Sequence, residues 1–180
     1  MQTADDVLKF WFVDHDRSHW FGGGPAFDAE LTEKFGDTHA AVARGEAWRW
    51  RATTDGRLAE IIVLDQFSRQ IHRGTPLAFA SDPTALVLAQ EAVAARHDLA
   101  VPPERRMFFY LPYMHSESLL IHEESLRLHK ALGIEEGINY ELAHQDVLRR
   151  FGRYPRRNEA LGRASTPEEA EYCASDEGKW

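Results

Sequence analysis

The stretch DGRLAEIIVLDQFSRQIH, residues 55–72, decides the fold of this chain. Its apolar residues recur at helical spacing and lie on nearly every side of the expected helix. They are Leu58, Ile61, Ile62, Val63, Leu64, Phe67 and Ile71. A helix that is hydrophobic all round is buried in the centre of a protein. The stretch therefore predicts a central helix over about residues 55–71.

One face of this central helix becomes ionic partway along. Asp65, Arg69 and His72 continue, at the helical period, the face that Leu58 and Ile61 begin. Burying an unpaired charge costs several kcal/mol, so we expect Asp65 and Arg69 to be buried together as an ion pair. This pair is either a structural ion pair or the floor of a polar pocket, and both interpretations stay open.

Helix signals continue on both sides of this stretch, and no segment alternates as clearly as a strand would. Thr3 with Asp6, and Thr166 with Glu169, have the spacing of a capping box at the start of a helix. Prolines and glycines mark most of the other helix ends. The predicted helices begin at about residues 3, 25, 55, 82, 102, 116, 136 and 166, and the fifth must end or kink at Pro112.

The connections between these helices are short, which makes neighbouring helices antiparallel. Residues 22–24, three glycines, are expected to form a turn, because the lysine of a phosphate-binding loop is missing. No linker or strict repeat divides the chain. The sequence therefore predicts an all-α fold: an irregular antiparallel array of helical pairs, with about eight to nine helices in a single domain over residues 1–180.

Composition and charge exclude several classes of function. A formal net charge of −8 argues against general nucleic-acid binding. The acidic N-terminus argues against a signal peptide, and no apolar run approaches the roughly 18 residues of a membrane span. We therefore expect a cytoplasmic protein without a membrane partner. Cys173 is the only cysteine, so no internal disulfide can form.

The nine histidines do not form a metal-binding motif. The sequence lacks His-Glu-x-x-His, and His115, His122 and His129 follow one another at seven-residue steps across an expected helix start. We therefore predict no metal and no cofactor. His144 lies on the apolar stripe of its helix and is expected to be a hydrogen-bonded core residue.

The run around Pro112 carries candidate catalytic residues. The proline leaves main-chain carbonyls unpaired at a point that is apolar on one side and polar on the other, where a ligand can reach the backbone. His115 and Glu117 are either an acid–base couple in such a pocket or part of an ordinary helix start. Asp65 is the third catalytic candidate, and Tyr113 is a candidate ligand-binding residue.

The segment 149–163 carries six arginines against a single acid, Glu159. Arginine holds phosphate and carboxylate through paired, charge-assisted hydrogen bonds. Arg153, Arg157 and Asn158 are therefore candidate ligand-binding residues, together with Gln66 and Arg69 of the central helix. The alternative is a solvated surface, or ion pairs with the acidic residues 168–177.

These motifs resemble the bacterial family called domain of unknown function 924 over about residues 5–172. The resemblance rests on residues 20–22, 64–69, 73–76, 110–117, 150–155, 157–158, 161–163 and 165–169. It implies a tetratricopeptide-like helical fold and supplies no established reaction. The chain departs from the family's pattern at Gln70, where asparagine is expected, and at Arg156, where histidine is frequent. If that histidine were catalytic in relatives, this chain would lack the group.

Two functions remain open. In the first, the candidate residues converge on one pocket that binds a small anionic ligand bearing phosphate or carboxylate, where a carboxylate or histidine would act as base in hydrolysis. In the second, a tetratricopeptide-like scaffold binds a peptide or protein without catalysis. Acids, arginines and histidines placed beside prolines and glycines favour the pocket. Its expected members are Asp65, Gln66, Arg69, His115, Glu117, Arg153, Arg157 and Asn158.

Overall fold

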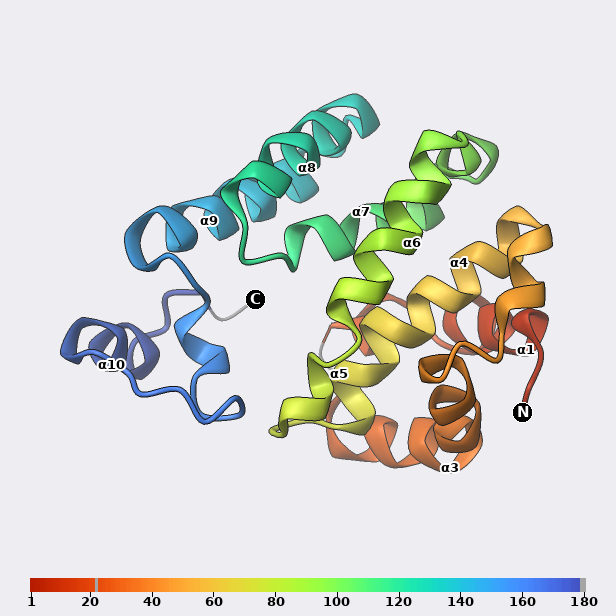
Figure 1. The fold of residues 1–180 in the computed structure, drawn as a ribbon, viewed down its shortest axis with the longest axis horizontal. Coiled ribbons are helices and arrows are strands. Elements are labelled where there is room, and N and C mark those ends of the chain that lie inside the picture. The colour runs from red at the N-terminus through yellow and green to blue at the C-terminus, as the bar shows by residue number, and fades with distance from the viewer. Residues whose placement is uncertain (22, 179–180) are drawn as a thin grey trace.

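The computed structural model describes residues 1–21 and 23–178, and in these residues it contains helices and no strand (Figure 1). The α-helices are α1 (Ala4–Lys9), α2 (Arg17–Trp20), α3 (Gly24–Ala43), α4 (Thr54–Ile62), α5 (Ser68–Ile71), α6 (Asp82–Ala94), α7 (Pro103–Met114), α8 (Leu119–Leu132), α9 (Glu135–Phe151) and α10 (Pro167–Ala174). Short 3₁₀ or π turns are η1 (Phe10–Asp14), η2 (Trp48–Ala52), η3 (Val63–Phe67), η4 (Pro76–Ala78), η5 (His97–Ala100) and η6 (Pro155–Arg157). The predicted all-α class is confirmed.

The central helix is present as α4, η3 and α5, which follow one another without a break. Leu58, Ile62 and Phe67 are fully buried in the main core, as predicted. The middle of the helix is a π turn over Val63–Phe67 that the apolar pattern did not reveal. Such a turn accommodates one additional residue in the helix, and it often accompanies a functional site.

Both predicted capping boxes are present. The side chain of Thr3 accepts a hydrogen bond from the backbone of Asp6, and Thr166 does the same for Glu169. In each case the carboxylate in turn accepts from the backbone of the threonine. These bonds satisfy N–H groups that would otherwise lack partners at a helix start, and they fix where α1 and α10 begin.

Three predicted boundaries differ from the structure. Of the two outcomes expected at Pro112, an end or a kink, the end is wrong: α7 continues to Met114, and its last turns are held by buried side chains such as Phe109 and Tyr113. α8 begins at Leu119 rather than near Ser116, whose carbonyl accepts a hydrogen bond from His122. α3 begins at Gly24, and Gly22 of the expected glycine turn lies outside the described residues.

The helices pack around two apolar clusters, a main core with residues from α1 to α8 and a smaller cluster near the C-terminal end of the chain. α7 packs on α8, and α8 packs on α9 across a two-residue connection at 133–134, which makes this pair antiparallel (Figure 1). The left-handed backbone of Gly133, with φ +77°, permits this tight reversal. A smaller cluster of Val147, Leu148, Tyr154 and Tyr172 joins α9 to α10. Within residues 1–21 and 23–178, no helix is long and apolar enough to span a bilayer.

Acid is expected to destabilise the fold through His39 of α3. This side chain is 6% exposed, and its Nε2 donates to Ser68 Oγ. Burial and the neighbouring His72 lower the pKa of His39 from 6.5 to about 4. Between these two pH values the unfolded chain binds a proton that the folded chain does not, so the free energy of unfolding falls as pH falls, by up to about 1.4 kcal/mol per pH unit.

Urea denaturation between pH 4.5 and 7 measures this dependence. The variant His39→Gln, whose amide keeps a donor for Ser68, is expected to give a shallower slope over the same range. Equal slopes in the two proteins would contradict the assignment to His39.

Candidate functional site

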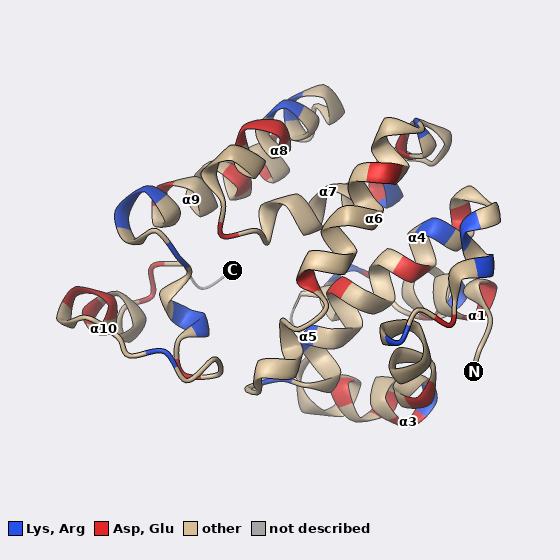
Figure 2. Ribbon diagram, viewed as in Figure 1, with Lys and Arg blue, Asp and Glu red and all other residues tan. Residues whose placement is uncertain are grey.

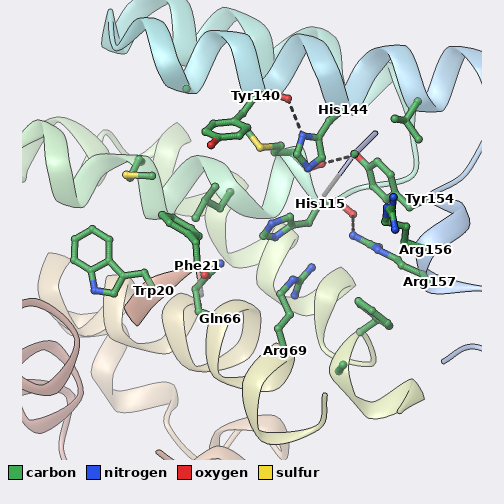
Figure 3. Close-up of a pocket in the computed structure, with 18 of the residues that line it drawn as sticks. Trp20, Phe21, Gln66, Arg69, His115, Tyr140, His144, Tyr154, Arg156 and Arg157 are labelled. Carbon is green, nitrogen blue, oxygen red and sulfur yellow. Dashed lines mark hydrogen bonds between the residues drawn. The ribbon is translucent and has the colours of Figure 1, made fainter. Parts of the chain in front are cut away.

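A cavity of about 670 Å³ lies between the central helix and the α8–α9 pair (Figure 3). Its residues come from α5 and α7 on one side, and from α8, α9 and η6 on the other. Most of its walls are apolar or aromatic. These walls include Trp20, Phe21, Phe79, Met107, Leu111, Met114, Leu132, Ile134, Tyr140 and Val147. Ligand sites in proteins are apolar clefts of this size with a few placed polar groups.

The polar part of the cavity is built around Asp65 and His115. Asp65 is part of the π turn and is 1% exposed. His115 is the residue that directly follows the last residue of α7. His115 Nδ1 lies 2.6 Å from Asp65 Oδ1, and Gln66 donates to the same carboxylate. Arg69 forms an ion pair with it, with 3.2 Å between Nη1 and Oδ1. Burial opposes the charge of this carboxylate, but Arg69 and His115 outweigh burial and hold the pKa of Asp65 below its usual range. Asp65 is therefore ionised.

His115 is neutral at pH 7. Burial and the Arg69 cation lower the pKa of His115, and the attraction of Asp65 offsets them only in part. Because an ionised carboxylate can only accept, the ring carries its proton on Nδ1 and donates it to Asp65. Nε2 therefore keeps its lone pair, and within the described residues it has no hydrogen-bond partner. His115 lines the cavity, so this acceptor belongs to the site.

Two arginines flank this histidine. Arg69 donates to both oxygens of Asp82 at 2.8 and 3.0 Å and to the backbone carbonyl of Asp65. Arg157 donates to the carbonyl of His115 at 2.8 Å and, more weakly, to Asp82 at 3.4 Å. Each guanidinium has five N–H donors, so both keep donors without a described acceptor. The side chains are 20% and 14% exposed, and both line the cavity.

Aromatic rings fix the orientation of Arg157. Its guanidinium carbon lies 4.8 Å from the ring centre of Phe79 and 4.6 Å from that of Tyr154. Burial lowers the pKa of Arg157, and the like charge of the nearby Arg69 lowers it further. The Asp82 carboxylate, which accepts hydrogen bonds from both arginines, offsets part of this repulsion.

The described cavity lining is basic, although the whole chain is acidic. It contains five arginines (Arg17, Arg69, Arg73, Arg156 and Arg157) and two glutamates (Glu104 and Glu136). Figure 2 shows basic residues at the end of α9 and in the segment after it, while α10 is acidic. The uneven charge noted in the sequence thus places positive charge at the cavity of a protein with a net charge of −8.

The structure brings together part of the predicted site. Gln66, Arg69, His115 and Arg157 line the cavity, and Asp65 lies directly behind His115. The predicted ion pair of Asp65 and Arg69 is confirmed, with both side chains largely buried and 3.2 Å apart.

The expected convergence is wrong for three other residues, Glu117, Arg153 and Asn158, which do not line this cavity, and neither does the separate candidate Tyr113. Glu117 is not the partner of His115: it accepts hydrogen bonds from Arg163 at 2.8 Å and from the backbone of Tyr154. Arg153 forms an ion pair with Glu169 at 2.6 Å. Asn158 is 1% exposed and bonds to Ser165 and Arg163, while Tyr113 is 3% exposed in the main core. Arg157 belongs to the 3₁₀ turn η6 and lines the cavity. The adjacent residues Arg156 and Asn158 form hydrogen bonds with residues of α10.

Sequence reasoning missed Asp82, whereas its expectation of a hydrogen-bonded core histidine at position 144 is confirmed. Asp82 was only the first residue of a helix, yet it bridges Arg69 and Arg157. His144 is buried and donates from Nδ1 to the carbonyl of Tyr140, as a core histidine does, but it also lines the cavity. Burial lowers its pKa to about 3. The described residues contain no cluster of metal-binding side chains.

The chain is similar to a known protein family and to a solved structure. A family model described as "Bacterial protein of unknown function (DUF924)" matches residues 7–177. The chain is also similar to a solved structure, the protein of unknown function ATU0120 from Agrobacterium tumefaciens, with 38% sequence identity and a TM-score of 0.88. That match covers 94% of this chain and 95% of the other. Among curated proteins, none matches the chain.

Proposed function

Because this chain belongs to the bacterial DUF924 family of unknown function, we propose a function from the site itself: the protein binds a small anion, a carboxylate or phosphate on an apolar body, in the cavity. The observation that carries this proposal is the pair Arg69 and Arg157, which line a cavity with mostly apolar walls and keep N–H donors without an acceptor among the described residues. Guanidinium groups bind carboxylate and phosphate through two parallel hydrogen bonds.

The charges around the pair leave room for an anion. Asp65 and Asp82 neutralise Arg69 and Arg157, and His115 adds no charge. Arg156 also lines the cavity, and its guanidinium donates to backbone carbonyls at the end of α10. No carboxylate among the described residues pairs with Arg156, so it adds a positive charge. In a poorly solvated cavity, that charge attracts an anion more strongly than it would at the surface.

The apolar walls select the rest of the ligand. Aromatic and aliphatic side chains from α7, α8 and α9 surround the space next to the arginines. Burying apolar ligand surface there contributes about 25 cal/mol per Å². A free inorganic anion would leave these walls unused, whereas an acid with an apolar body fills both parts of the site.

Octanoate is expected to stabilise the protein, while 1-octanol at the same concentration does so much less. At a ligand concentration of 100 times Kd, binding adds about 2.7 kcal/mol to the free energy of unfolding. For a chain of this length, that corresponds to a rise in Tm of about 5 to 10 °C. Differential scanning fluorimetry measures it, and octyl phosphate tests the second head group.

Arg157→Met is the informative variant, because methionine keeps an apolar stem between Phe79 and Tyr154 but removes the donors. It is expected to abolish the octanoate shift. Arg153→Met is the matched control, since this arginine pairs with Glu169 outside the cavity. If Arg157→Met lowered Tm but left every ligand shift unchanged, the interaction-scaffold function would be favoured instead.

A further inference from the structure

We infer that the cavity is also the active site of an esterase, in which His115 is the general base that activates water against carboxylic esters of apolar acids. This inference rests on the proposed function, because the carboxylate that the arginines bind would be the product of the reaction. The observation behind it is the hydrogen-bonded pair of Asp65 and His115, whose second ring nitrogen belongs to the cavity.

The pair has the geometry that a general base requires. The Nδ1–H of His115 is held by the buried carboxylate of Asp65 at 2.6 Å, which fixes the ring and its tautomer. The lone pair of Nε2 is then available to accept a proton from water. Asp65 also stabilises the imidazolium that forms, and it acts as a positioning residue because it lies behind His115 and does not line the cavity.

A second cavity histidine shows what is special about His115. His144 also has its Nδ1 tied down, but by the backbone carbonyl of Tyr140 at 2.7 Å. A neutral carbonyl stabilises an imidazolium less than an ionised carboxylate does. Of these two histidines, His115 is therefore the one equipped to hold a proton during a reaction.

Arg69 and Arg157 provide the other requirement, which is stabilisation of a developing negative charge. Both have N–H donors left over in the same cavity, and both are fixed by Asp82, with Phe79 and Tyr154 also holding Arg157. Fixed donors in a space with little water stabilise an oxyanion without reorganising during the reaction. The same donors would hold an ester carbonyl before the reaction and a carboxylate after it.

The reaction balances without a further reactant. Water gives a proton to His115 Nε2 as its oxygen bonds to the ester carbonyl carbon, and the carbonyl electron pair moves to the oxygen held by the arginines. The tetrahedral intermediate then re-forms the C=O bond and breaks the bond to the alcohol oxygen. That oxygen takes the proton from the His115 imidazolium. The products are the alcohol and the carboxylic acid, which releases its remaining proton to solvent water and stays as a carboxylate beside Arg69 and Arg157.

The apolar walls define the substrate class as esters with a hydrophobic acyl group. Of the 4-nitrophenyl esters, the octanoate is therefore expected to be hydrolysed with a higher kcat/KM than the acetate by the full-length protein. His115→Gln is expected to lower kcat/KM for the octanoate at least about 100-fold, since a positioned general base contributes about 10²–10⁴.

His19→Gln is the matched control. His19 also lies next to an aspartate, with 3.1 Å between its Nδ1 and Asp16 Oδ1, but on the surface and outside the cavity. This variant is expected to keep full activity. Hydrolysis that is equally fast in His115→Gln would overturn the inference. So would the absence of hydrolysis in the unaltered protein.

Asp65→Asn tests the positioning role through the pH profile. The charged or titratable groups around His115 include Asp65 and Arg69 of the central helix, Asp82 of α6, Arg157 of η6, His129 of α8 and His144 of α9. The kcat/KM of the unaltered protein should rise with pH to a plateau as His115 loses its proton. Asp65 raises the pKa of His115, so the Asn variant should reach its lower plateau at a lower pH. An unmoved midpoint would contradict the role of Asp65.

Binding and catalysis can fail separately. If octanoate stabilises the protein but no ester is hydrolysed, the anion-binding function stands and the esterase inference falls. If hydrolysis depends on His115 but octanoate gives no thermal shift, the proposed binding function falls, and with it the role given to the arginines. Circular dichroism of each variant confirms that it folds before its rate is compared.

Discussion

Arg69→Ala is expected to lower the free energy of unfolding by about 3–5 kcal/mol, the cost of breaking a buried ion pair by removing one partner. Arg69 holds two acids at once, Asp65 at 3.2 Å and Asp82 at 2.8 Å. Asp65 is 1% exposed, and its other partners, His115 and Gln66, are neutral. Without the guanidinium, its charge remains buried with no cation to balance it. Urea denaturation at pH 7 measures the loss.

Arg73→Ala is the matched control for this experiment. Arg73 follows the same helix and also forms a two-pronged pair, with Asp28, but its side chain is 59% exposed. Exposed ion pairs contribute about 0–1 kcal/mol, so this variant should stay within about 1 kcal/mol of the unaltered protein. A similarly small loss for Arg69→Ala would contradict this expectation, because it would mean that water solvates the Asp65 carboxylate once the guanidinium is removed.

Glu141→Ala is expected to be nearly as damaging, at about 3 kcal/mol or more, although it lies outside the cavity. Its carboxylate is fully buried and accepts from His122 at 2.6 Å, Ser125 at 2.6 Å and Gln145 at 3.0 Å. A buried donor left without its acceptor costs about 1–3 kcal/mol, and this change leaves three such groups. The bonds from His122 and Ser125 join α8 to α9, so the loss should appear in chemical denaturation.

Glu124→Ala is the corresponding control on α8. Glu124 also accepts two hydrogen bonds, both from Arg127, but its side chain is 42% exposed. Its removal should cost less than about 1 kcal/mol. Equal losses in the two variants would show that the buried network around Glu141 contributes no more than a surface pair.

Local sequence signals predicted the elements of the fold well. The capping boxes at Thr3 and Thr166 depend on residues three positions apart, so the sequence contains all the information needed to place them. Pro112 shows the limit of such reasoning. Proline disfavours a helix interior locally, yet the burial of side chains from α7 outweighs this preference, and burial depends on distant parts of the chain.

The candidate site was predicted only in part, for the same reason. Asp65 and Arg69 share one helix, so the helical period and the cost of desolvation were enough to pair them. His115 and Asp65 are 50 residues apart in the sequence, so no local pattern indicates that they pair. Glu117, the nearer acid and the partner considered for His115 from the sequence, pairs with Arg163 instead. Arg157 and Arg153 are chemically alike, and only the path of the chain through η6 separates a cavity residue from a structural one.

The π turn at Val63–Phe67 sets the phase of the central helix. An α-helix rotates by about 100° per residue, so an extra residue in one turn changes the direction of every side chain that follows. Two helices of equal length, one with this π turn and one without it, would therefore present different residues to the cavity. Loops in general tolerate changes in length, but a one-residue deletion in this turn would redirect Arg69 and Ser68 together. The spacing between residues 58 and 69 is thus as much a part of the site as the side chains themselves.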